Sequence, residues 1–536
     1  MGFRFFVVLC RWLAWGAWCV AVPALAASPV AGSTALEPPG GAVSRLAVMP
    51  SWFVQGRPVP DASVALAALA DAASQGLVAD DYQAAALAAA FHEAARNGAG
   101  PEVAARLDLA LTAALERYLR DLNQGRLSPE TLTYRFKAPP VPAFDAHAVL
   151  LQARLTNDLS RSLAAAQPQT PMYEAIRSAL AAYRALADHP AWRVELPPLP
   201  ARSLKPGQAY DGLAPLVARL VALGDLTTTL PLSGPLYDGP VVEGVRRFQS
   251  RHGLEPDGVI GPATMAQLNV TPAQRVGQMA LTLERLRWTP LTHGSRMIVV
   301  NVPEFILRAY EMIGAEVDLQ LEMRVVVGRA LDTRTPIFLE DMRFIEFSPY
   351  WNVPPSIARG ETLPRLRRDP AYFDQQGFEF VTRDGTVVTT LTDEAIAAVQ
   401  RGDWRIRQRP GPRNALGDIK FILPNDQNIF LHHTPAPQLF SRVRRDFSHG
   451  CIRIESPVAL AQFVLRDQPH WTAQRIEEAM TAGTSRTVRL PQPVPVLIAY
   501  STVVVKDGGK VHFFPDIYQQ DARLEQALRV ARPSLP

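Results

Sequence analysis

The sequence predicts a multidomain α+β protein, with helical domains in the first half of the chain and a β-rich domain after about residue 295. Three observations lead to this prediction. The length of 536 residues corresponds to roughly three domains. Ala- and Leu-rich segments with helical periodicity fill the region 49–205. Short β-branched or aromatic runs, most of them bounded by Pro, Gly or Asn, begin at Met297.

The first 26 residues are predicted to be a signal peptide. Arg4 precedes an apolar stretch that ends in Ala24-Leu25-Ala26, the small-x-small pattern of a cleavage site. Arg11 interrupts this stretch, which is also short for a membrane span. We therefore expect export to the periplasm without stable membrane insertion after cleavage; retention of the leader as an anchor is the alternative. Residues 27–48, rich in Pro, Gly, Ser and Ala, are expected to be a flexible linker.

The composition excludes some classes of protein. Hydrophobic residues make up 48% of the chain despite its 47 prolines, which favours a folded protein with many loops over a disordered one. The 55 basic residues are nearly balanced by 51 acidic ones. A nucleic-acid binder would show a concentrated basic face, so we expect no nucleic-acid partner.

The region 49–205 is predicted to be a helical domain. Apolar residues recur at helical spacing from Val103 to Leu122, Gly125 marks the end of that helix, and similar runs cover 62–74 and 172–186. This region has no tight cluster of catalytic residue types. We therefore expect it to serve as a scaffold.

Residues 211–270 are predicted to form a small three-helix module. Gly258 and Gly261 permit tight turns, and Pro262 and Thr264 lie at the start of the third helix. The pattern FQ…HGL…DGVIGPAT…LN, from Phe248 to Asn269, resembles the peptidoglycan-binding module. The residue pattern alone gives only a helical bundle; the ligand is implied by the resemblance.

A helix opened by Thr271-Pro272 and running through Trp288 leads into the β-rich domain, residues 295–500. Residues 351–407 are punctuated by Pro and Arg and include a helical run at 393–401. They are too long for a simple loop, so we expect a folded insertion that caps a site. A C-terminal extension, residues 501–536, is expected to begin with a hairpin around the turn Asp507-Gly508-Gly509.

Cys451 is the one cysteine that remains after the leader, which contains Cys10 and Cys19. It lies in Ser448-His449-Gly450-Cys451, downstream of His432 and His433. A lone thiol in an exported chain has no intrachain disulfide partner, and neighbouring histidines can convert it to a nucleophilic thiolate. Fifteen residues separate His432 from Ser448, enough for a loop that returns so that its two ends meet.

The backbone around Cys451 adds to this hypothesis. Gly450 allows close approach of the backbone, and the N–H groups there could stabilise an oxyanion. The apolar run after Pro457 indicates a helix, and a position just before its N-terminus would favour a thiolate. Two alternatives stay open on spacing alone. One is a zinc site, although the spacing fits no common structural zinc pattern, and the other is a purely structural role for the Cys and His residues.

The motif and its surroundings resemble the L,D-transpeptidase catalytic domain, in the large Gram-negative branch of that family. Beside His432 and Ser448–Cys451, the resemblance rests on the stretches Val300–Pro303, Pro349–Ile357, Gln408–Pro412, Asn414–Gly417, Lys420-Phe421, Leu431–Pro435 and Arg445–Ser448. It covers nearly the whole mature chain. It implies a helical scaffold, a peptidoglycan-binding module and a β-rich catalytic domain with an inserted capping subdomain.

The resemblance also implies roles for individual residues. Cys451 would be the nucleophile and His432 the general base and acid, oriented by the backbone carbonyl of His433. His449 would help to shape the site, and Gly450 and Cys451 would offer oxyanion N–H groups. Ser448, Arg453 and Trp351 would bind substrate. Two positions depart from the family pattern: His433 stands where small or acidic residues are usual, and Phe430 where Tyr is frequent.

The implied reaction is a transfer between stem peptides of peptidoglycan. The thiolate would attack the carbonyl between an L-centre and a D-residue of a tetrapeptide stem, expel D-alanine and form a thioester. The side-chain amine of a neighbouring diamino acid would then resolve it, cross-linking two third-position residues. No metal or organic cofactor is required, and the partners would be stem peptides and glycan strands. The alternatives are an L,D-carboxypeptidase, with water as acceptor, and a wall-binding protein with an inert catalytic domain.

Overall fold

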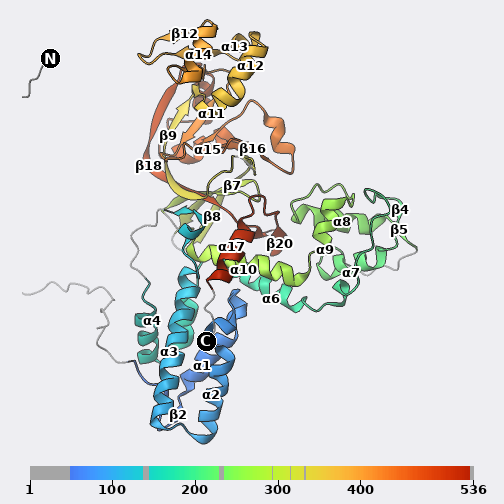
Figure 1. The fold of residues 1–536 in the computed structure, drawn as a ribbon, viewed down its shortest axis with the longest axis vertical. Coiled ribbons are helices and arrows are strands. Elements are labelled where there is room, and N and C mark those ends of the chain that lie inside the picture. The colour runs from blue at the N-terminus through green and yellow to red at the C-terminus, as the bar shows by residue number, and fades with distance from the viewer. Residues whose placement is uncertain are drawn as a thin grey trace, which may run out of the picture. The chain divides into compact units, whose positions relative to one another are not determined.

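The computed structural model describes residues 49–136, 144–227, 234–291, 294–313, 316–330, 333–506 and 508–531, and Figure 1 shows their helices and strands. The predicted signal peptide and linker lie outside the described residues, as does Asp507 of the predicted turn. The prediction of a multidomain α+β fold is confirmed. Within the described ranges, no helix combines the length and the apolar character that crossing a membrane requires.

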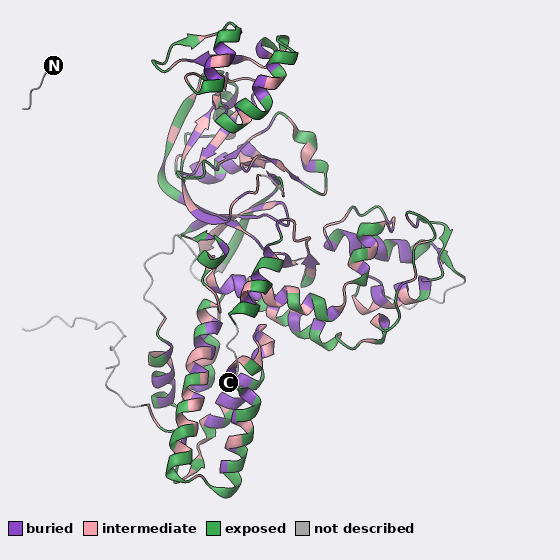
Figure 2. Cartoon of the chain, in the orientation of Figure 1, coloured by how far each residue is buried: buried purple, intermediate pink, exposed green. Residues whose placement is uncertain are grey.

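The first region is helical. Its helices are α1 (Pro60–Ala70), α2 (Ala84–Asn97), α3 (Pro101–Gln124), α4 (Ala146–Thr156), α5 (Leu159–Ala166) and α6 (Pro171–Ala185), with short turns η1 (Ala72–Gln75), η2 (Ala79–Tyr82), η3 (Pro129–Leu132) and η4 (Pro190–Trp192) and a small hairpin of β1 (Phe53–Val54) and β2 (Arg57–Pro58). The longest of them, α3, ends where Gly125 takes a left-handed φ of 78°, as the sequence predicts. Exposed residues cover the outer faces of these helices, and buried ones lie toward their neighbours (Figure 2).

The second region is a small module of β4 (Gln208–Ala209), α7 (Leu213–Ala222), β5 (Leu236–Tyr237), α8 (Gly239–Arg251) and α9 (Pro262–Asn269). Its apolar core also includes Leu196, Leu204 and Tyr210, which precede α7. The buried Gln249 amide accepts from the Gly258 N–H at 2.8 Å and donates to the Val259 carbonyl at 2.9 Å. The Gln and the Asp-Gly-Val of the FQ…DGV pattern are thus joined by hydrogen bonds, since the Gln249 side chain stabilises the turn before α9.

The helix α10 (Pro272–Trp288) connects this module to the β-rich domain. Its N-terminus has the capping box of Thr271 and Gln274, in which each side chain bonds the other residue's backbone N–H. The strands of the β-rich domain are β6 (Arg296–Asn301), β7 (Ile306–Ile313), β8 (Glu316–Gly328), β9 (Phe338–Phe347), β14 (Ile419–Ile422), β15 (Leu431–His432), β16 (Asp446–Ser448), β17 (Ile452–Ile454) and β18 (Arg486–Ala499); its helices are α15 (Pro457–Leu465) and α16 (Ala473–Thr481), with a turn η6 (Pro437–Ser441).

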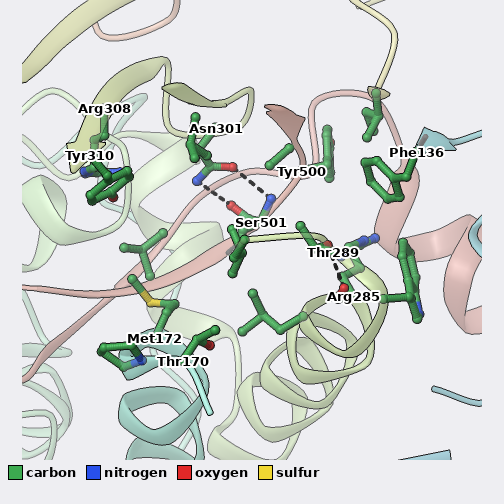
Figure 3. A pocket seen from close by; sticks show the side chains of 18 of the residues that line it. Phe136, Thr170, Met172, Arg285, Thr289, Asn301, Arg308, Tyr310, Tyr500 and Ser501 are labelled. Atoms are coloured by element: carbon green, nitrogen blue, oxygen red, sulfur yellow. Dashed lines mark hydrogen bonds between the residues drawn. The ribbon is translucent and has the colours of Figure 1, made fainter. Parts of the chain in front are cut away.

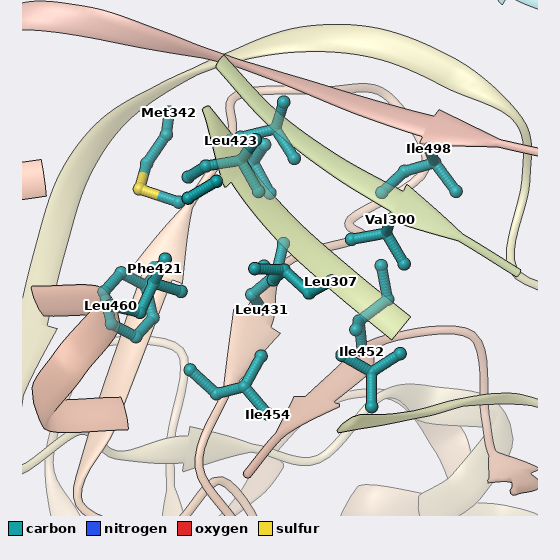
Figure 4. Packing of buried hydrophobic residues seen from close by; sticks show 14 of the residues in the cluster. Val300, Leu307, Met342, Phe421, Leu423, Leu431, Ile452, Ile454, Leu460 and Ile498 are labelled. Atoms are coloured by element: carbon teal, nitrogen blue, oxygen red, sulfur yellow. The ribbon is translucent and has the colours of Figure 1, made fainter. Parts of the chain in front are cut away.

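These strands form one mixed sheet that closes on itself. In the described part of the chain the order is β14-β15-β17-β8-β7-β6-β18-β9, and β9 pairs in turn with β14. The strand β3 (Arg135–Phe136) of the helical region adds to β9, and β16 adds to β8. Closure leaves the strands of the circuit without a free edge. Its interior is filled by side chains of β6, β7, β14, β15, β17 and β18 together with Leu460 of α15 (Figure 4).

The insertion predicted at 351–407 folds around its own core. It contains β10 (Trp351–Asn352), α11 (Pro355–Ile357), a π-helical turn η5 (Ala358–Thr362), α12 (Leu363–Arg368), α13 (Ala371–Gln375), β11 (Phe378–Val381), β12 (Val387–Val388), α14 (Asp393–Arg401) and β13 (Arg405–Gln408). A separate sheet in the order β10-β13-β11-β12 carries an apolar cluster that includes Leu363, Phe380 and Ile406. The predicted helix 393–401 is confirmed.

The C-terminal extension contains β19 (Val503–Lys506), β20 (Lys510–Phe513) and α17 (Gln520–Val530), and the predicted hairpin is confirmed. The strand that precedes this extension, β18, starts at Arg486 and ends at Ala499. The sequence obscures the first half of β18 because Pro491 and Pro493 lack backbone donors. The structure places both prolines where the pairing with β9 shifts register, between Arg489 and Val494.

Candidate active site

Three adjacent strands carry the candidate residues on one face of the sheet. In the pairing register, Lys420 of β14 lies opposite His432 of β15, and His432 lies opposite Arg453 of β17. Successive strand residues point to opposite faces, so the intervening Phe421, Leu431 and Ile452 enter the apolar core. Each of these strands therefore supplies its alternate residues to the opposite, polar face.

Phe430 and Cys451 extend this polar face by one more pair. The Ile452 N–H donates to the Phe430 carbonyl at 3.1 Å, which continues the alignment of the two strands upstream. The Phe430 ring lies 5.8 Å from the His432 ring, centroid to centroid, and the Lys420 Nζ lies 4.1 Å from the Phe430 centroid. The strand register thus brings Cys451 and His432 to neighbouring positions on one face, although 18 residues lie between them in the sequence.

His432 is buried and held in one tautomer. Its Nδ1 lies 2.5 Å from the backbone carbonyl of His433, the contact implied by the family resemblance. Because a carbonyl only accepts, Nδ1 carries the proton and Nε2 keeps its lone pair. Burial lowers the pKa of His432 to about 3, and the positive charges of Arg453 and Lys420 act in the same direction. His432 is therefore neutral at physiological pH, with Nε2 able to accept a proton.

Cys451 is half-buried, and its Sγ lies 3.6 Å from the Asn428 carbonyl oxygen. Burial raises the pKa of the thiol, while the Phe430 backbone, Lys420 and Arg453 act in the opposite direction. The folded environment thus favours the thiol over the thiolate. A thiol beside a neutral imidazole requires proton transfer as the sulfur attacks.

The expectation that Cys451 directly precedes a helix is wrong. The strand β17 follows it immediately, and α15 begins only at Pro457. Ile452–Ile454 remain extended because β17 pairs with β15 on one side and with β8 on the other. The start of α15 is therefore separated from Cys451 by a strand along the chain.

Ser448 and Gly450 form a tight turn before Cys451. The Ser448 hydroxyl donates to the Cys451 carbonyl at 2.5 Å and accepts from the Gly450 N–H at 3.1 Å. Ser448 is buried and engaged within the loop, which gives it a loop-shaping position, and the substrate contact expected from the sequence stays a prediction. The Gly450 N–H is likewise occupied. Among the described residues, no backbone carbonyl accepts from the Cys451 N–H, so this group remains available as a donor.

The remaining predicted residues have different surroundings. His449 Nε2 is 2.7 Å from Glu361 Oε1 in η5, so the insertion reaches the motif itself. Trp351 packs partly against the apolar cluster of the insertion. Arg453 has a buried Nε that finds no hydrogen-bond partner in the described ranges. His433 Nδ1 is 3.3 Å from Asp418 Oδ2.

The structure also bears on metal binding and on a cavity away from the candidate residues. Within the described residues, no three His, Cys, Asp or Glu side chains are grouped closely enough to hold a metal ion. An apolar cavity of about 250 Å³ lies among Phe136, Met172 and Trp288, with Asn301 and Ser501 hydrogen-bonded on its wall (Figure 3). None of the candidate residues lines this cavity.

Comparison with protein families identifies three parts of the chain. Residues 295–496 match the family described as "L,D-transpeptidase catalytic domain", residues 215–268 match "Putative peptidoglycan binding domain", and residues 45–180 match "Scaffold domain". The resemblance inferred from the motifs is therefore confirmed. The catalytic-domain match includes every candidate residue, from Trp351 to Arg453.

A curated relative supports the same assignment. A Haemophilus influenzae protein named "Putative L,D-transpeptidase" is 31% identical over 250 residues, which are 47% of this chain and 49% of that protein. The chain thus spans about half the length of this relative.

Two solved structures overlap weakly with this chain. Bd1075 of Bdellovibrio bacteriovorus has 13% identity and a TM-score of 0.17, over 44% of this chain and 56% of its own. A fused Zn-dependent amidase/peptidase/peptidoglycan-binding-domain protein of Clostridium acetobutylicum has 14% identity and a TM-score of 0.15, over 55% and 99%. Overlaps this low do not indicate a shared overall fold.

Proposed function

We propose that this protein is a periplasmic L,D-transpeptidase that cross-links peptidoglycan stem peptides through a thioester on Cys451. The observation that carries the proposal is the shared sheet face of Cys451 and His432, with His432 Nδ1 fixed by the His433 carbonyl. This arrangement leaves Nε2 as a proton acceptor on the sheet face that also carries Cys451, the one free thiol of the described chain. The match of residues 295–496 to the catalytic-domain family agrees with it.

In the first half-reaction, the Cys451 sulfur attacks the carbonyl that precedes the terminal D-alanine of a tetrapeptide stem. Its proton passes to His432 Nε2, because the thiol is protonated and the imidazole neutral at rest. The Cys451 N–H stabilises the oxyanion. The carbon–nitrogen bond then breaks, and D-alanine leaves with the proton returned by the His432 imidazolium. The product is a thioester.

In the second half-reaction, the side-chain amine of a diamino acid on a neighbouring stem attacks the thioester. His432 takes a proton from this amine and returns it to the departing sulfur, which restores the thiol. Arg453 is suited to hold a substrate carboxylate, because its buried Nε has no partner among the described residues and its charge acts on Cys451. None of these steps requires a cofactor.

Mass spectrometry of the products tests the proposal. Purified protein is incubated with tetrapeptide-containing muropeptides, and we expect release of D-alanine together with a dimer linked through third-position residues. Tripeptide without dimer would indicate the carboxypeptidase alternative, and unchanged substrate would indicate a wall-binding protein with an inert domain. Cys451→Ala should abolish both products without unfolding the protein, because a small side chain replaces another. Equal activity of wild type and Cys451→Ala would contradict the assignment of the nucleophile.

A further inference from the structure

The C-terminal extension reaches the turn of Cys451 through a chain of buried hydrogen bonds. Tyr518, just before α17, is 1% exposed. Its hydroxyl donates to the Gly328 carbonyl at 2.6 Å and accepts from the Thr335 N–H at 3.2 Å. Tyr518 lies outside the region 295–496 that matches the catalytic-domain family. Tyr518 of the extension is thus hydrogen-bonded to Thr335, and Thr335 contacts the turn before Cys451.

Thr335 makes the contact with that turn. It is 1% exposed, and its hydroxyl accepts from the Gly328 N–H at 2.8 Å while donating to the Gly450 carbonyl at 2.7 Å. The Gly450 carbonyl and the Cys451 N–H belong to one planar peptide unit, in which the two groups point in opposite directions. A bond that fixes the Gly450 oxygen therefore also fixes the direction of the Cys451 N–H.

This turn needs such support because its backbone is free to rotate. Gly450 adopts a φ of 115°, which L side chains rarely adopt, and glycine itself imposes no conformation. The Ser448–His449 peptide is held in the same way, since the Ser448 carbonyl accepts from the Thr333 hydroxyl at 2.9 Å and from the Arg329 N–H at 3.0 Å. The Ser448 and Gly450 carbonyls are thus oriented by Arg329, Thr333 and Thr335.

The packing leaves this contact little room to move. A Cβ on Gly328 would lie 2.0 Å from the Thr333 carbonyl oxygen and 2.7 Å from the Thr335 nitrogen, so only glycine fits there. Tyr518 is itself anchored, because its N–H donates to the Tyr500 hydroxyl at 2.9 Å and that hydroxyl donates to Asp516 at 2.6 Å. The hydroxyl of Tyr518 is accordingly held at a fixed position.

We propose that Thr335 is a positioning residue for the Cys451 N–H, and that Tyr518 of the C-terminal extension holds Thr335 in place for this purpose. The inference rests on the proposed transferase function, in which the Cys451 N–H stabilises the oxyanion. Neither side chain touches the reacting atoms. Both act through the Gly450–Cys451 peptide, so their loss should slow the chemical steps more than it weakens substrate binding.

The test compares variants that differ in one hydroxyl. Thr335→Val removes the hydroxyl at nearly constant shape, Thr335→Ser keeps it, and Tyr518→Phe removes the phenolic oxygen while keeping the ring. Release of D-alanine from a tetrapeptide stem gives kcat and KM, and thermal unfolding gives Tm. Thr282→Val and Tyr82→Phe are matched controls. Both remove a buried hydroxyl, one bonded to a backbone carbonyl and the other to Asp121, at positions outside the site.

We expect Thr335→Val to lower kcat by about a hundredfold, the scale of losing one oxyanion donor, with KM changed less than about threefold. Tyr518→Phe should lower kcat by about tenfold, because Thr335 keeps its own bonds to Gly328 and Gly450. Thr335→Ser should retain kcat within about threefold of wild type, which separates the hydroxyl from general packing.

Three results would overturn the inference: unchanged kcat in Thr335→Val, equal losses in Thr335→Ser and Thr335→Val, or losses matched by the two controls. If Thr335→Val fails to fold, Tyr518→Phe and Thr335→Ser decide the question, since a Tyr518→Phe variant with wild-type kcat contradicts the proposal. An inactive wild type would instead refute the proposed function. The two failures are therefore distinguishable.

Discussion

Replacing Gly417 by alanine should lower turnover, because it displaces the His433 carbonyl that holds His432. Gly417 has a φ of 65°, and a Cβ there would lie 2.7 Å from His433 Cβ and 2.8 Å from the His433 carbonyl carbon and Nδ1. Ordinary contacts begin at 3.4 Å, so the His433 main chain must retreat by about 0.6 Å. That carbonyl is the group that fixes His432 Nδ1 at 2.5 Å.

The magnitude follows from this displacement. A misplacement of about 1 Å at a reacting group costs about a hundredfold in rate. A shift of about 0.6 Å transmitted to His432 should therefore lower kcat by at least about tenfold. Alanine in a left-handed conformation also destabilises the fold by about 1 to 2 kcal/mol, whatever its surroundings. This second effect must be separated from the first.

Gly483→Ala separates the two effects. Gly483 has a φ of 70°, close to that of Gly417, but nothing lies within 4 Å of its Cβ position. Both variants should lose thermal stability from the left-handed alanine, Gly417→Ala somewhat more because of the clash with His433, whereas only Gly417→Ala should lose turnover of a tetrapeptide stem. The assay measures kcat and Tm for both variants and wild type. Equal kcat values in Gly417→Ala and Gly483→Ala would refute the argument that the His433 carbonyl positions the base.

Four further predictions concern the site and its partner. His432→Ala should slow turnover by at least about a hundredfold, the scale of a lost general base, and a greater loss in His433→Ala would show that the two roles are reversed. The rate of alkylation of the free thiol by iodoacetamide should keep rising with pH up to about 9, because burial raises the pKa of Cys451. His432, whose pKa is lowered to about 3, carries no charge that would stabilise a thiolate. A plateau of the rate by pH 6 would contradict this expectation. A carbapenem should form a covalent adduct visible by intact-mass spectrometry on wild type and absent from Cys451→Ala, since a strained lactam carbonyl is attacked like the donor carbonyl; an adduct that persists in the variant would place acylation elsewhere. The full chain carrying Cys451→Ala should co-sediment with isolated sacculi, and retention equal to that of an unrelated protein would argue against wall binding.

Local signals in the sequence predicted much of the fold. The apolar spacing from Val103 to Leu122 with Gly125 after it gave α3, and Thr271-Pro272 gave the start of α10. Such signals depend on residues within a few positions of one another, as helix periodicity and caps do. The same kind of reasoning missed the first half of β18, because its prolines oppose a strand locally while the neighbouring β9 stabilises it.

The candidate residues were also predictable, but their states were not. The cluster of Cys451 and His432 is evident from residue types and spacing alone. Whether the pKa of each residue lies above or below its ordinary value depends on burial and on the charges of Lys420 and Arg453. The closed sheet brings these two charges to the same face. The sequence consequently suggested a thiolate where the folded environment favours a thiol.

The sequence by itself determined the kind of chemistry: a lone thiol, a histidine at the end of a strand, and a glycine that lets the backbone turn before the thiol. Only the tertiary structure decided how that turn is held. Thr335 lies 115 residues before Gly450, and Tyr518 lies 183 residues after Thr335. Hydrogen bonds between such distant residues leave no periodicity or local motif. They form because the sheet and the C-terminal extension bury these polar groups together, where each must find a partner.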